Sequence, residues 1–518
     1  MNTAQPASPV PPPPPLTGGM LVLLTAGLAL GTFMEVLDTS IANVSVPTIA
    51  GSMGVSTDQG TWVISSYAVA AAIAVPLTGW LARRVGENRL FSWSVLLFTL
   101  MSMLCGLATN MTTLVLFRLL QGLVSGPMVP LSQTILLRNY PPEKRGVAMA
   151  LWAMTVVIAP ILGPLLGGWI TENYSWPWIF YINMPVGIAS GLISYSLLKG
   201  RETKTAKIPI DIIGLVLLVI GVGSLQMMLD LGNDRDWFSS PFILTLGLTA
   251  LVCLTFLVAW ELTEKHPIVD LSLFKQRNFA FGTMILAGGY LTFFSSVVIF
   301  PLWLQQTMGY TASQAGLATA PVGIFALFLS PWVGKNMQRY DLRILVSIGF
   351  VIFAIVSFWN ASFTLESSFG QVVLPRLLQG AGIAFFFVPT NTILMSGLDE
   401  SRMAAASGLS NFFRTLSGAI GTSLSVTLWD HRAIFHHARL GEALRASNSA
   451  TQDYLSRLHD LGLSPQMAYA QLERVLNTQA FMMSTNEFYH LSGYAFLGLI
   501  AVAWVTRPQR GMKAAMGH

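Results

Sequence analysis

The sequence predicts an all-α polytopic membrane protein with 14 transmembrane helices. Three observations predict this fold class: an apolar composition, a series of hydrophobic runs of membrane length, and basic residues gathered in every second loop. Of the 518 residues, 53% are hydrophobic and 10% are charged, and the mean hydropathy is +0.60. Soluble domains carry roughly 25% charged residues, so an ordinary soluble enzyme is excluded.

Each predicted helix is an apolar run of about 20 residues, the length needed to cross the hydrocarbon core. The runs do not alternate as barrel strands would, and unpaired backbone groups are not tolerated in lipid, so the spans are expected to be helical. The first run has no cleavage site and is expected to be retained. The predicted spans are 20–43, 61–82, 90–108, 112–136, 147–169, 178–198, 210–229, 240–261, 279–300, 313–333, 343–363, 370–394, 404–428 and 486–506.

The loop charges orient these spans. Most of the 29 lysines and arginines lie on the side of the two termini, for example Arg83 and Arg84 after the second span. The positive-inside rule then places both termini, the disordered leader 1–19 and the tail 507–518, in the cytoplasm. The formal charge of +5 is therefore a topology signal, and no nucleic-acid partner is expected.

An internal repeat divides the chain. The string Arg-Leu-Leu-Gln-Gly occurs at 118–122 and again at 376–380, 258 residues later. A second repeated motif, Pro-x-x-Gly, occurs at 76–79 and at 331–334. Parallel repeats of this kind are typical of secondary transporters. The predicted units are an N-terminal six-helix half 20–199, an inserted helix pair 200–278, and a C-terminal half 279–506 that includes an external loop 429–484.

Five charged residues lie inside predicted spans and away from their edges: Glu35, Asp38, Arg118, Arg376 and Arg414. A charge at the bilayer centre costs about 2.5–3.5 kcal/mol and marks a functional candidate. Glu35 and Asp38 share a helix face, and Arg118 enters from the same side at a similar depth. A carboxylate balanced between a second acid and an arginine can exchange a proton. Asp38 is therefore the leading proton site. A static Asp38–Arg118 ion pair and a lining role for Glu35 are the alternatives.

A central cavity with apolar walls is also predicted, since aromatic and methionine side chains adapt to varied ligands. Core packing or lipid contact is the alternative for the aromatic residues, which include Phe385 and Phe387. Structural ion pairs are the alternative for the arginines. The predicted lining residues are Phe33, Asn43, Gln121, Trp152, Met154, Arg376, Phe386, Asn411 and Arg414.

The fifth predicted span is rich in proline and glycine, which kink a helix and let a neighbour approach closely. A hinge or gate is favoured over simple packing of small residues. The residues of this predicted gating motif are Pro160, Gly163, Pro164, Gly167 and Gly168.

The external loop 429–484 is predicted to form a helical hairpin with one apolar side. It begins with three histidines, which could bind a metal but more simply form a solvated face. The sequence has no phosphate-binding loop and no catalytic constellation, so neither a cofactor nor an enzyme activity is expected. The histidines are His431, His436 and His437, and the apolar positions are Leu455, Leu458, Met467, Leu472 and Leu476.

The chain resembles the fourteen-span drug:proton antiporters of the major facilitator superfamily, of the type that serves as inner-membrane subunit of multidrug efflux systems. The residues that carry the resemblance run from about 20 to 506. They are Leu37 to Val44 with Pro47 to Ala50, Trp62 to Ile64, Arg118 with Gln121 and Gly122, Gly163-Pro164 with Gly167-Gly168, and Trp176, Trp178, Phe180, Asn183 and Pro185. Two positions depart from the family pattern: Arg83 replaces a usual aspartate, and Glu35 replaces an uncharged polar residue.

The resemblance implies export of amphipathic toxic compounds in exchange for protons across a bacterial inner membrane. It also implies a periplasmic adaptor protein and an outer-membrane channel as partners, with loop 429–484 as an adaptor contact or a lid on the protein itself. Two other functions stay open: export of a narrow physiological substrate such as a fatty acid or siderophore, and a membrane enzyme or receptor that moves no solute.

Overall fold

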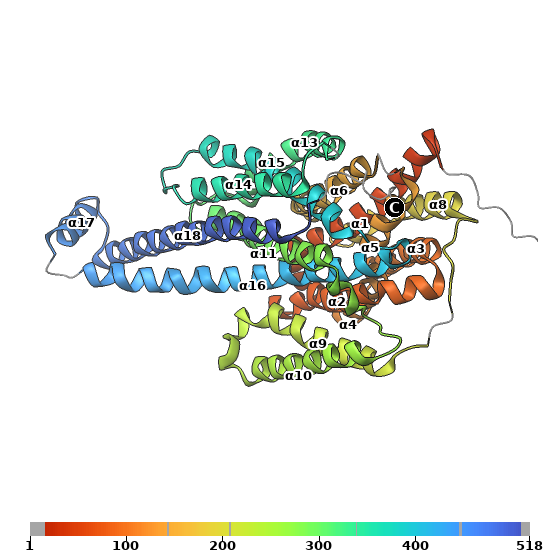
Figure 1. Ribbon diagram of the computed structural model, residues 1–518. Helices are drawn as coiled ribbons and strands as arrows, with labels where there is room; N and C mark the ends of the chain where they lie inside the picture. Colours follow the sequence, from red (N-terminus) through yellow and green to blue (C-terminus); the bar gives the residue numbers. More distant parts are fainter. Residues whose placement is uncertain (1–15, 142–143, 207–208, 338, 445–447, 509–518) are drawn as a thin grey trace, which may run out of the picture.

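The computed structural model describes residues 16–141, 144–206, 209–337, 339–444 and 448–508, so most of the predicted leader and tail lies outside the described residues. Within these ranges the chain is helical and has no β-strand (Figure 1). The α-helices are α1 (Gly18–Met53), α2 (Thr57–Val85), α3 (Glu87–Gly106), α4 (Met111–Ser125), α5 (Met128–Asn139), α6 (Arg145–Asn173), α7 (Trp178–Tyr181), α8 (Asn183–Leu198), α9 (Ile212–Leu231), α10 (Pro241–Thr263), α11 (Arg277–Gln306), α12 (Ala312–Thr319), α13 (Val322–Asn336), α14 (Leu342–Asn360), α15 (Phe369–Met395), α16 (Met403–Ala443), α17 (Ser449–Asp460) and α18 (Pro465–Val505).

Local sequence sets several helix ends. At the start of α2, Ser56 Oγ accepts a hydrogen bond from the Gln59 N–H, and Gln59 Oε1 accepts one from the Ser56 N–H. This reciprocal box satisfies backbone donors that have no partner inside the helix. α1 ends at Gly54, whose φ of 66° is a left-handed conformation that glycine adopts without strain. Helix α1 thus continues from the predicted end at 43 to Met53, with Pro47 inside it.

Twelve helical segments in the described part of the chain are long and apolar enough to cross a membrane, and α6 makes a thirteenth if its two bent parts form one span. The predicted count of fourteen is therefore not confirmed. The remaining predicted span, 404–428, lies in α16, which is not among these segments. Its inward face carries the polar residues Ser407, Ser410 and Asn411 together with Arg414, and they lower its hydropathy while the helix stays packed in the bundle.

Two predicted spans consist of two helices each. The span predicted at 112–136 is divided into α4 and α5 at Gly126 and Pro127, and the span predicted at 313–333 is divided into α12 and α13 at Ala320 and Pro321. Proline lacks the N–H that would continue the hydrogen-bond ladder, so a break at these positions is expected. The segments Met111–Asn139 and Gln314–Asn336, which include these breaks, are each long and apolar enough to cross a membrane once.

The helices form one bundle in which segments far apart in the sequence are neighbours. α1 packs on α6 and α8, α2 on α4, and α14 on α15 and α18. Contacts between the predicted N-terminal and C-terminal halves come from α2 and α5 with α16 and from α6 with α13 and α15. The helices of the predicted insertion, α9 and α10, pack on each other, and α9 also contacts α2 and α16 at one side of the bundle (Figure 1).

The segment 429–484 is not a separate external unit, because α16 and α18 continue through it as a long antiparallel pair with α17 near its tip (Figure 1). Trp429 is buried in this pair and donates through Nε1 to Thr485 Oγ1 at 2.8 Å. The predicted apolar side holds only in part: the exposed fraction is 8% for Leu476 and 62% for Met467. Packing between the two long helices buries one face, and near the tip α17 contacts α18 while Met467 stays exposed.

Candidate functional site

The most buried ion pair among the described residues joins Asp38 of α1 to Arg118 of α4. The exposed fraction is 2% for Asp38 and 0% for Arg118. Arg118 Nη1 lies 2.5 Å from Asp38 Oδ2, and Arg118 Nε donates to the carbonyl oxygen of Val63 at 3.0 Å. The pair therefore ties α1, α2 and α4 together at one point inside the bundle.

Two amides complete this cluster. Asn183 Nδ2 donates to Asp38 Oδ1 at 2.7 Å and to Ser102 Oγ at 3.0 Å. Gln121 Nε2 donates to Asp38 Oδ1 at 3.3 Å, and its Oε1 accepts from Arg118 Nη1 at 2.9 Å. Hydrogen bonds to a charged carboxylate are about twice as strong as neutral ones. The Asp38 carboxylate is thus held by a cation and two amides.

Sequence reasoning did not place Asn183 in this site. Asn183 was quoted only as part of a family pattern, although an amide at the start of an apolar span is itself a signal for a buried partner. Tyr67 of α2 was also missed: the guanidinium carbon of Arg118 lies 4.3 Å from the centre of its ring. The Arg118 charge is therefore covered by an aromatic face as well as by Asp38.

Glu35 lies one turn before Asp38 on α1 but does not join the ion pair. Its Oε2 is buried and has no hydrogen-bond partner among the described residues. Arg414 of α16 and Asp38 are the charged side chains whose fields act on it. The guanidinium carbon of Arg414 lies 5.3 Å from the ring centre of Tyr290 and 6.0 Å from that of Trp152.

Trp152 of α6 is buried and donates through Nε1 to Ser132 Oγ of α5 at 2.9 Å. Ser132 Oγ also accepts from Thr32 Oγ1 of α1 at 2.8 Å. Trp152 thus joins a short polar chain across three helices, and the ring faces Arg414 of a fourth. This tryptophan is part of the packed interior and does not line the cavity described next.

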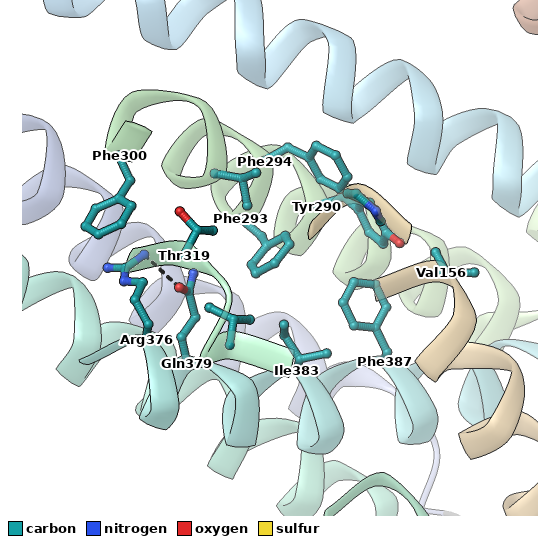
Figure 2. Close-up of a pocket in the computed structure, with 13 residues that line it drawn as sticks. Val156, Tyr290, Phe293, Phe294, Phe300, Thr319, Arg376, Gln379, Ile383 and Phe387 are labelled. Carbon is teal, nitrogen blue, oxygen red and sulfur yellow. Dashed lines mark hydrogen bonds between the residues drawn. The ribbon is translucent and has the colours of Figure 1, made fainter. Parts of the chain in front are cut away.

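A cavity lies next to these residues, and Tyr290, whose ring is near Arg414, is one of its lining residues (Figure 2). Its walls come from α6, α11, α12, α13 and α15, and they are mostly aromatic and aliphatic. The lining residues are Val156, Pro160, Tyr290, Phe293, Phe294, Val297, Phe300, Thr319, Val322, Arg376, Gln379, Ile383 and Phe387.

Of the predicted lining residues, Arg376 and Phe387 line this cavity, together with Pro160 of the predicted gating motif. Phe386, the neighbour of Phe387, does not line it. Successive helical residues point about 100° apart. The Phe386 ring therefore lies in an aromatic core with Phe350 and Phe353.

The other predicted lining residues are placed elsewhere. Phe33 packs in a second hydrophobic cluster, Asn43 is exposed on α1, and Met154 is half-buried on α6. Gln121 belongs to the Asp38 cluster. Phe385 is half-buried, with its ring centre 6.2 Å from that of Trp332.

Asn411 belongs to a second polar cluster, which joins α5, α15 and α16. Gln133 Nε2 donates to Asn391 Oδ1 at 3.1 Å, and Gln133 Oε1 accepts from Ser407 Oγ at 2.9 Å and from Asn411 Nδ2 at 3.3 Å. All four residues are buried. The prediction named Asn411 alone, because nothing local in the sequence shows that these helices meet.

The predicted gating motif lies where α6 meets α1. The two parts of α6 on either side of residues 161–164 are bent by 41°, and the Pro160 carbonyl accepts from Ser40 Oγ at 3.1 Å. A Cβ at Gly163 would lie 2.3 Å from Ser40 Oγ, whereas a Cβ at Gly168 would meet nothing within 4 Å. Gly167 faces Ile41, and the side chain of Pro164 lies outside the described residues.

Glycines also permit two close contacts at the end of the bundle that carries the Arg83–Arg84 loop. A Cβ at Gly79 of α2 would lie 2.7 Å from the Cβ of Ala405 of α16. A Cβ at Gly146 of α6 would lie 2.3 Å from the carbonyl oxygen of Gly334 of α13. Gly79 and Gly334 are the two glycines of the repeated Pro-x-x-Gly motif. Both backbone contacts require the absence of a side chain.

The three histidines do not gather into a metal site. His436 Nε2 lies 3.1 Å from Glu487 Oε2, and His437 Nε2 lies 2.7 Å from Glu473 Oε1. Within the ranges that the structure describes, no three His, Cys, Asp or Glu side chains are placed to hold a metal ion.

Comparison with known proteins adds a family and a fold. The family model described as Major Facilitator Superfamily matches residues 28–422. The chain is 50% identical to the multidrug export protein EmrB of Haemophilus influenzae, over 96% of this chain and 98% of that protein. It is 47% identical to the fatty acid resistance protein FarB of Neisseria gonorrhoeae, over 95% and 97%. The crystal structure of the proton:xylose symporter XylE gives a TM-score of 0.59 at 14% identity, covering 95% of this chain and 97% of that one, which shows a shared fold.

Proposed function

The chain belongs to the major facilitator superfamily, and from this membership we propose that it exports amphipathic drugs and toxic compounds in exchange for protons. It is a multi-pass membrane transporter and not an enzyme. The observation that carries the proton-coupling proposal is the buried Asp38–Arg118 pair, an ionisable cluster inside the bundle. Nearly full-length identity to multidrug export proteins supports the substrate class.

In this proposal Asp38 takes up and releases the proton and Arg118 is its electrostatic partner. The charged carboxylate holds α1, α2, α4 and α8 together through Arg118 and Asn183. Protonation removes the negative charge, so the salt bridge is lost and the guanidinium is left partly uncompensated. The packing of these helices then becomes sensitive to proton occupancy, which is how a proton can bias a conformational equilibrium.

We further propose that the bundle has 14 spans, with two six-helix halves that rock around the central region. The contacts that would open and close are those of α2 with α16 and of α6 with α13, where glycines bring backbones together. The bend in α6 would act as the hinge. Substrate and proton would then reach the centre alternately from the two sides.

The proposed location is a bacterial inner membrane, with both termini in the cytoplasm. The distribution of basic loop residues supports this orientation. A periplasmic adaptor and an outer-membrane channel are the proposed partners. The protruding α16–α18 pair with α17 would then face the periplasm as the adaptor contact (Figure 1).

The test is internal pH in proteoliposomes on addition of lipophilic cations and weak acids. Wild type is expected to move protons when a drug is added, and Asp38→Asn is expected to lose this response. Asp270→Asn is the matched control, because it removes a carboxylate that pairs with Arg402 outside the central cluster. A full response in Asp38→Asn would reject Asp38 as the proton site.

A second candidate function is export of a physiological fatty acid. It is favoured by the 47% identity to a fatty acid resistance protein. It is also favoured by Arg376, a cavity arginine of which two nitrogens have no hydrogen-bond partner among the described residues. A substrate panel separates the two: a narrow exporter would respond to long-chain carboxylates and to no drug.

A further inference from the structure

The two copies of Arg-Leu-Leu-Gln-Gly have the same internal geometry but different surroundings. In each copy the arginine Nη1 donates to the glutamine Oε1 three residues later, at 2.9 Å in the first and 2.7 Å in the second. Arg118 also pairs with Asp38. Arg376 is equally buried, with an exposed fraction of 2%, yet no described carboxylate pairs with it.

Two nitrogens of Arg376, Nε and Nη2, have no hydrogen-bond partner among the described residues. These two N–H groups lie on one edge of the planar guanidinium, the edge that binds both oxygens of a carboxylate. The third nitrogen is occupied by Gln379. Arginine does not lose its charge in proteins, so the Arg376 guanidinium stays positively charged and has no anion at its open edge.

The groups around Arg376 do not supply that anion. The ring centre of Phe300 lies 4.0 Å from the guanidinium carbon and offers only its π-face. The hydroxyl of Tyr489 lies close enough to accept a hydrogen bond from the guanidinium, but it is a phenol that carries no charge at neutral pH. Figure 2 shows Arg376 and Gln379 together at one end of the cavity, with Phe300 across from them.

The rest of the cavity is apolar. Phe293, Ile383 and Phe387 extend away from the Arg376 end along its length (Figure 2). A ligand that fits such a space has one anionic head for the open guanidinium edge and an apolar body for the aromatic wall. Most of its affinity would come from buried apolar area, and its orientation from the charged contact.

We propose that Arg376 binds the carboxylate of an anionic amphiphile through Nε and Nη2, with the ligand's alkyl or aromatic body lying along the cavity. This inference deepens the proposed export function. It rests on that function for the claim that a ligand in this cavity is a transported substrate. It assigns a substrate class, carboxylate-bearing amphiphiles, and one binding residue. Arg118 is not assigned this role, because it already has its counter-charge in Asp38 and its Nε donates to the carbonyl oxygen of Val63.

The test is calorimetric binding to the full-length protein in lipid nanodiscs, with empty nanodiscs subtracted. The probes are dodecanoate, dodecanol and dodecyltrimethylammonium, which share an alkyl chain and differ in head charge. Wild type is expected to bind dodecanoate at least about tenfold more tightly than the other two, the size expected for charge-assisted hydrogen bonds. Equal affinities in wild type would overturn the proposal without any variant.

The variants then locate the contact. Arg376→Gln is expected to lose the preference for dodecanoate and to keep dodecanol binding, which also shows that the cavity is intact. Arg376→Lys keeps the charge but not the planar edge, so an intermediate affinity is expected. Arg402→Gln, which alters an arginine paired with Asp270 at the surface, is the control and is expected to bind as wild type. An undiminished dodecanoate preference in Arg376→Gln would overturn the proposal.

Binding at equilibrium separates this inference from the proposed transport. Asp38→Asn is expected to bind dodecanoate as wild type does, because Arg376 and Asp38 lie in different clusters. If no compound moves protons but dodecanoate binding still depends on Arg376, the export proposal fails and the binding site stands. If drugs move protons but dodecanoate binds no more tightly than dodecanol and dodecyltrimethylammonium, the export proposal stands and the Arg376 binding site fails.

Discussion

Gln133 of α5 donates a hydrogen bond to Asn391 of α15 at 3.1 Å, and the two residues are 258 positions apart, the same separation as Arg118 and Arg376. Equivalent positions of the two repeat copies therefore touch each other. Residues related by a pseudo-two-fold axis meet only where they lie close to that axis, so this pair marks the centre of the bundle. Ser407 and Asn411 join it from α16.

Removing the Gln133 amide should weaken this central contact. Gln133→Leu leaves Asn391 Oδ1 without its partner and removes one of several partners of Ser407 and Asn411, and an unsatisfied buried group costs about 1–3 kcal/mol. A lower thermal unfolding temperature of the purified protein is the expected result. Gln305→Leu changes an exposed glutamine of α11 and should leave that temperature unchanged. Equal stability of the two variants would contradict the central role of Gln133.

The buried ion pair should show strong coupling in a double-mutant cycle. Asp38→Asn alone leaves the Arg118 guanidinium buried without a counter-charge, and breaking a buried pair costs about 3–5 kcal/mol. Asp38→Asn combined with Arg118→Gln removes both charges and should recover much of that loss. The coupling between the two side chains is measured by thermal unfolding of Asp38→Asn, Arg118→Gln and the double variant beside wild type. Additive losses of stability would mean that Asp38 and Arg118 do not form an ion pair in the membrane. Drug-driven proton movement should stay absent in the double variant, because the proposed proton site is removed.

Two glycines of the α6 motif should differ sharply in their tolerance of alanine. Gly163→Ala places a Cβ 2.3 Å from Ser40 Oγ and forces α1 and α6 apart, whereas Gly168→Ala meets nothing within 4 Å. Drug resistance conferred on a sensitive host, with the protein level measured alongside, should fall for Gly163→Ala only. If both variants confer wild-type resistance, the close approach of α1 to α6 is not needed for transport.

Contact between α6 and α13 should decide how far one end of the bundle closes. Gly146→Val puts a side chain against the carbonyl oxygen of Gly334 and should hold this end open. Spin labels at Arg83→Cys and Lys335→Cys, in a background lacking Cys105 and Cys253, report the separation of the two loops. A longer mean distance in Gly146→Val is expected. The label pair with Gly168→Val is the control, and an unchanged distance in Gly146→Val would exclude a closure role for this contact.

Much of the helical framework could be predicted from the sequence. Lipid leaves the backbone no alternative to helices, so each long apolar run is itself evidence for a span. The exception is α16: its polar residues face the interior, and a hydropathy average does not distinguish an inward polar face from a solvated segment. The segment 429–484 was predicted as a helical hairpin outside the spans, but the apolar signal does not show that its two long helices continue directly from the predicted spans as α16 and α18.

The residues of the site were predicted less completely than the framework. Asp38 and Arg118 were predicted together because charged groups in apolar runs stand out, whereas Gln121 was predicted as a cavity residue and lies in the Asp38 cluster instead. Whether a given aromatic residue lines the cavity depends on the rotation of one helix against its neighbours, as Phe386 and Phe387 show. That rotation is a property of the packed bundle.

The sequence by itself determined the membrane class, most of the spans, the family and the presence of two identical Arg-Leu-Leu-Gln-Gly segments. It also determined the Arg-to-Gln hydrogen bond inside each copy, because residues three apart on a helix are neighbours. Only the tertiary structure decided that Arg118 meets Asp38 while Arg376 faces a cavity. The physical reason is that a counter-charge comes from another helix, and helices distant in sequence acquire their neighbours only when the bundle packs.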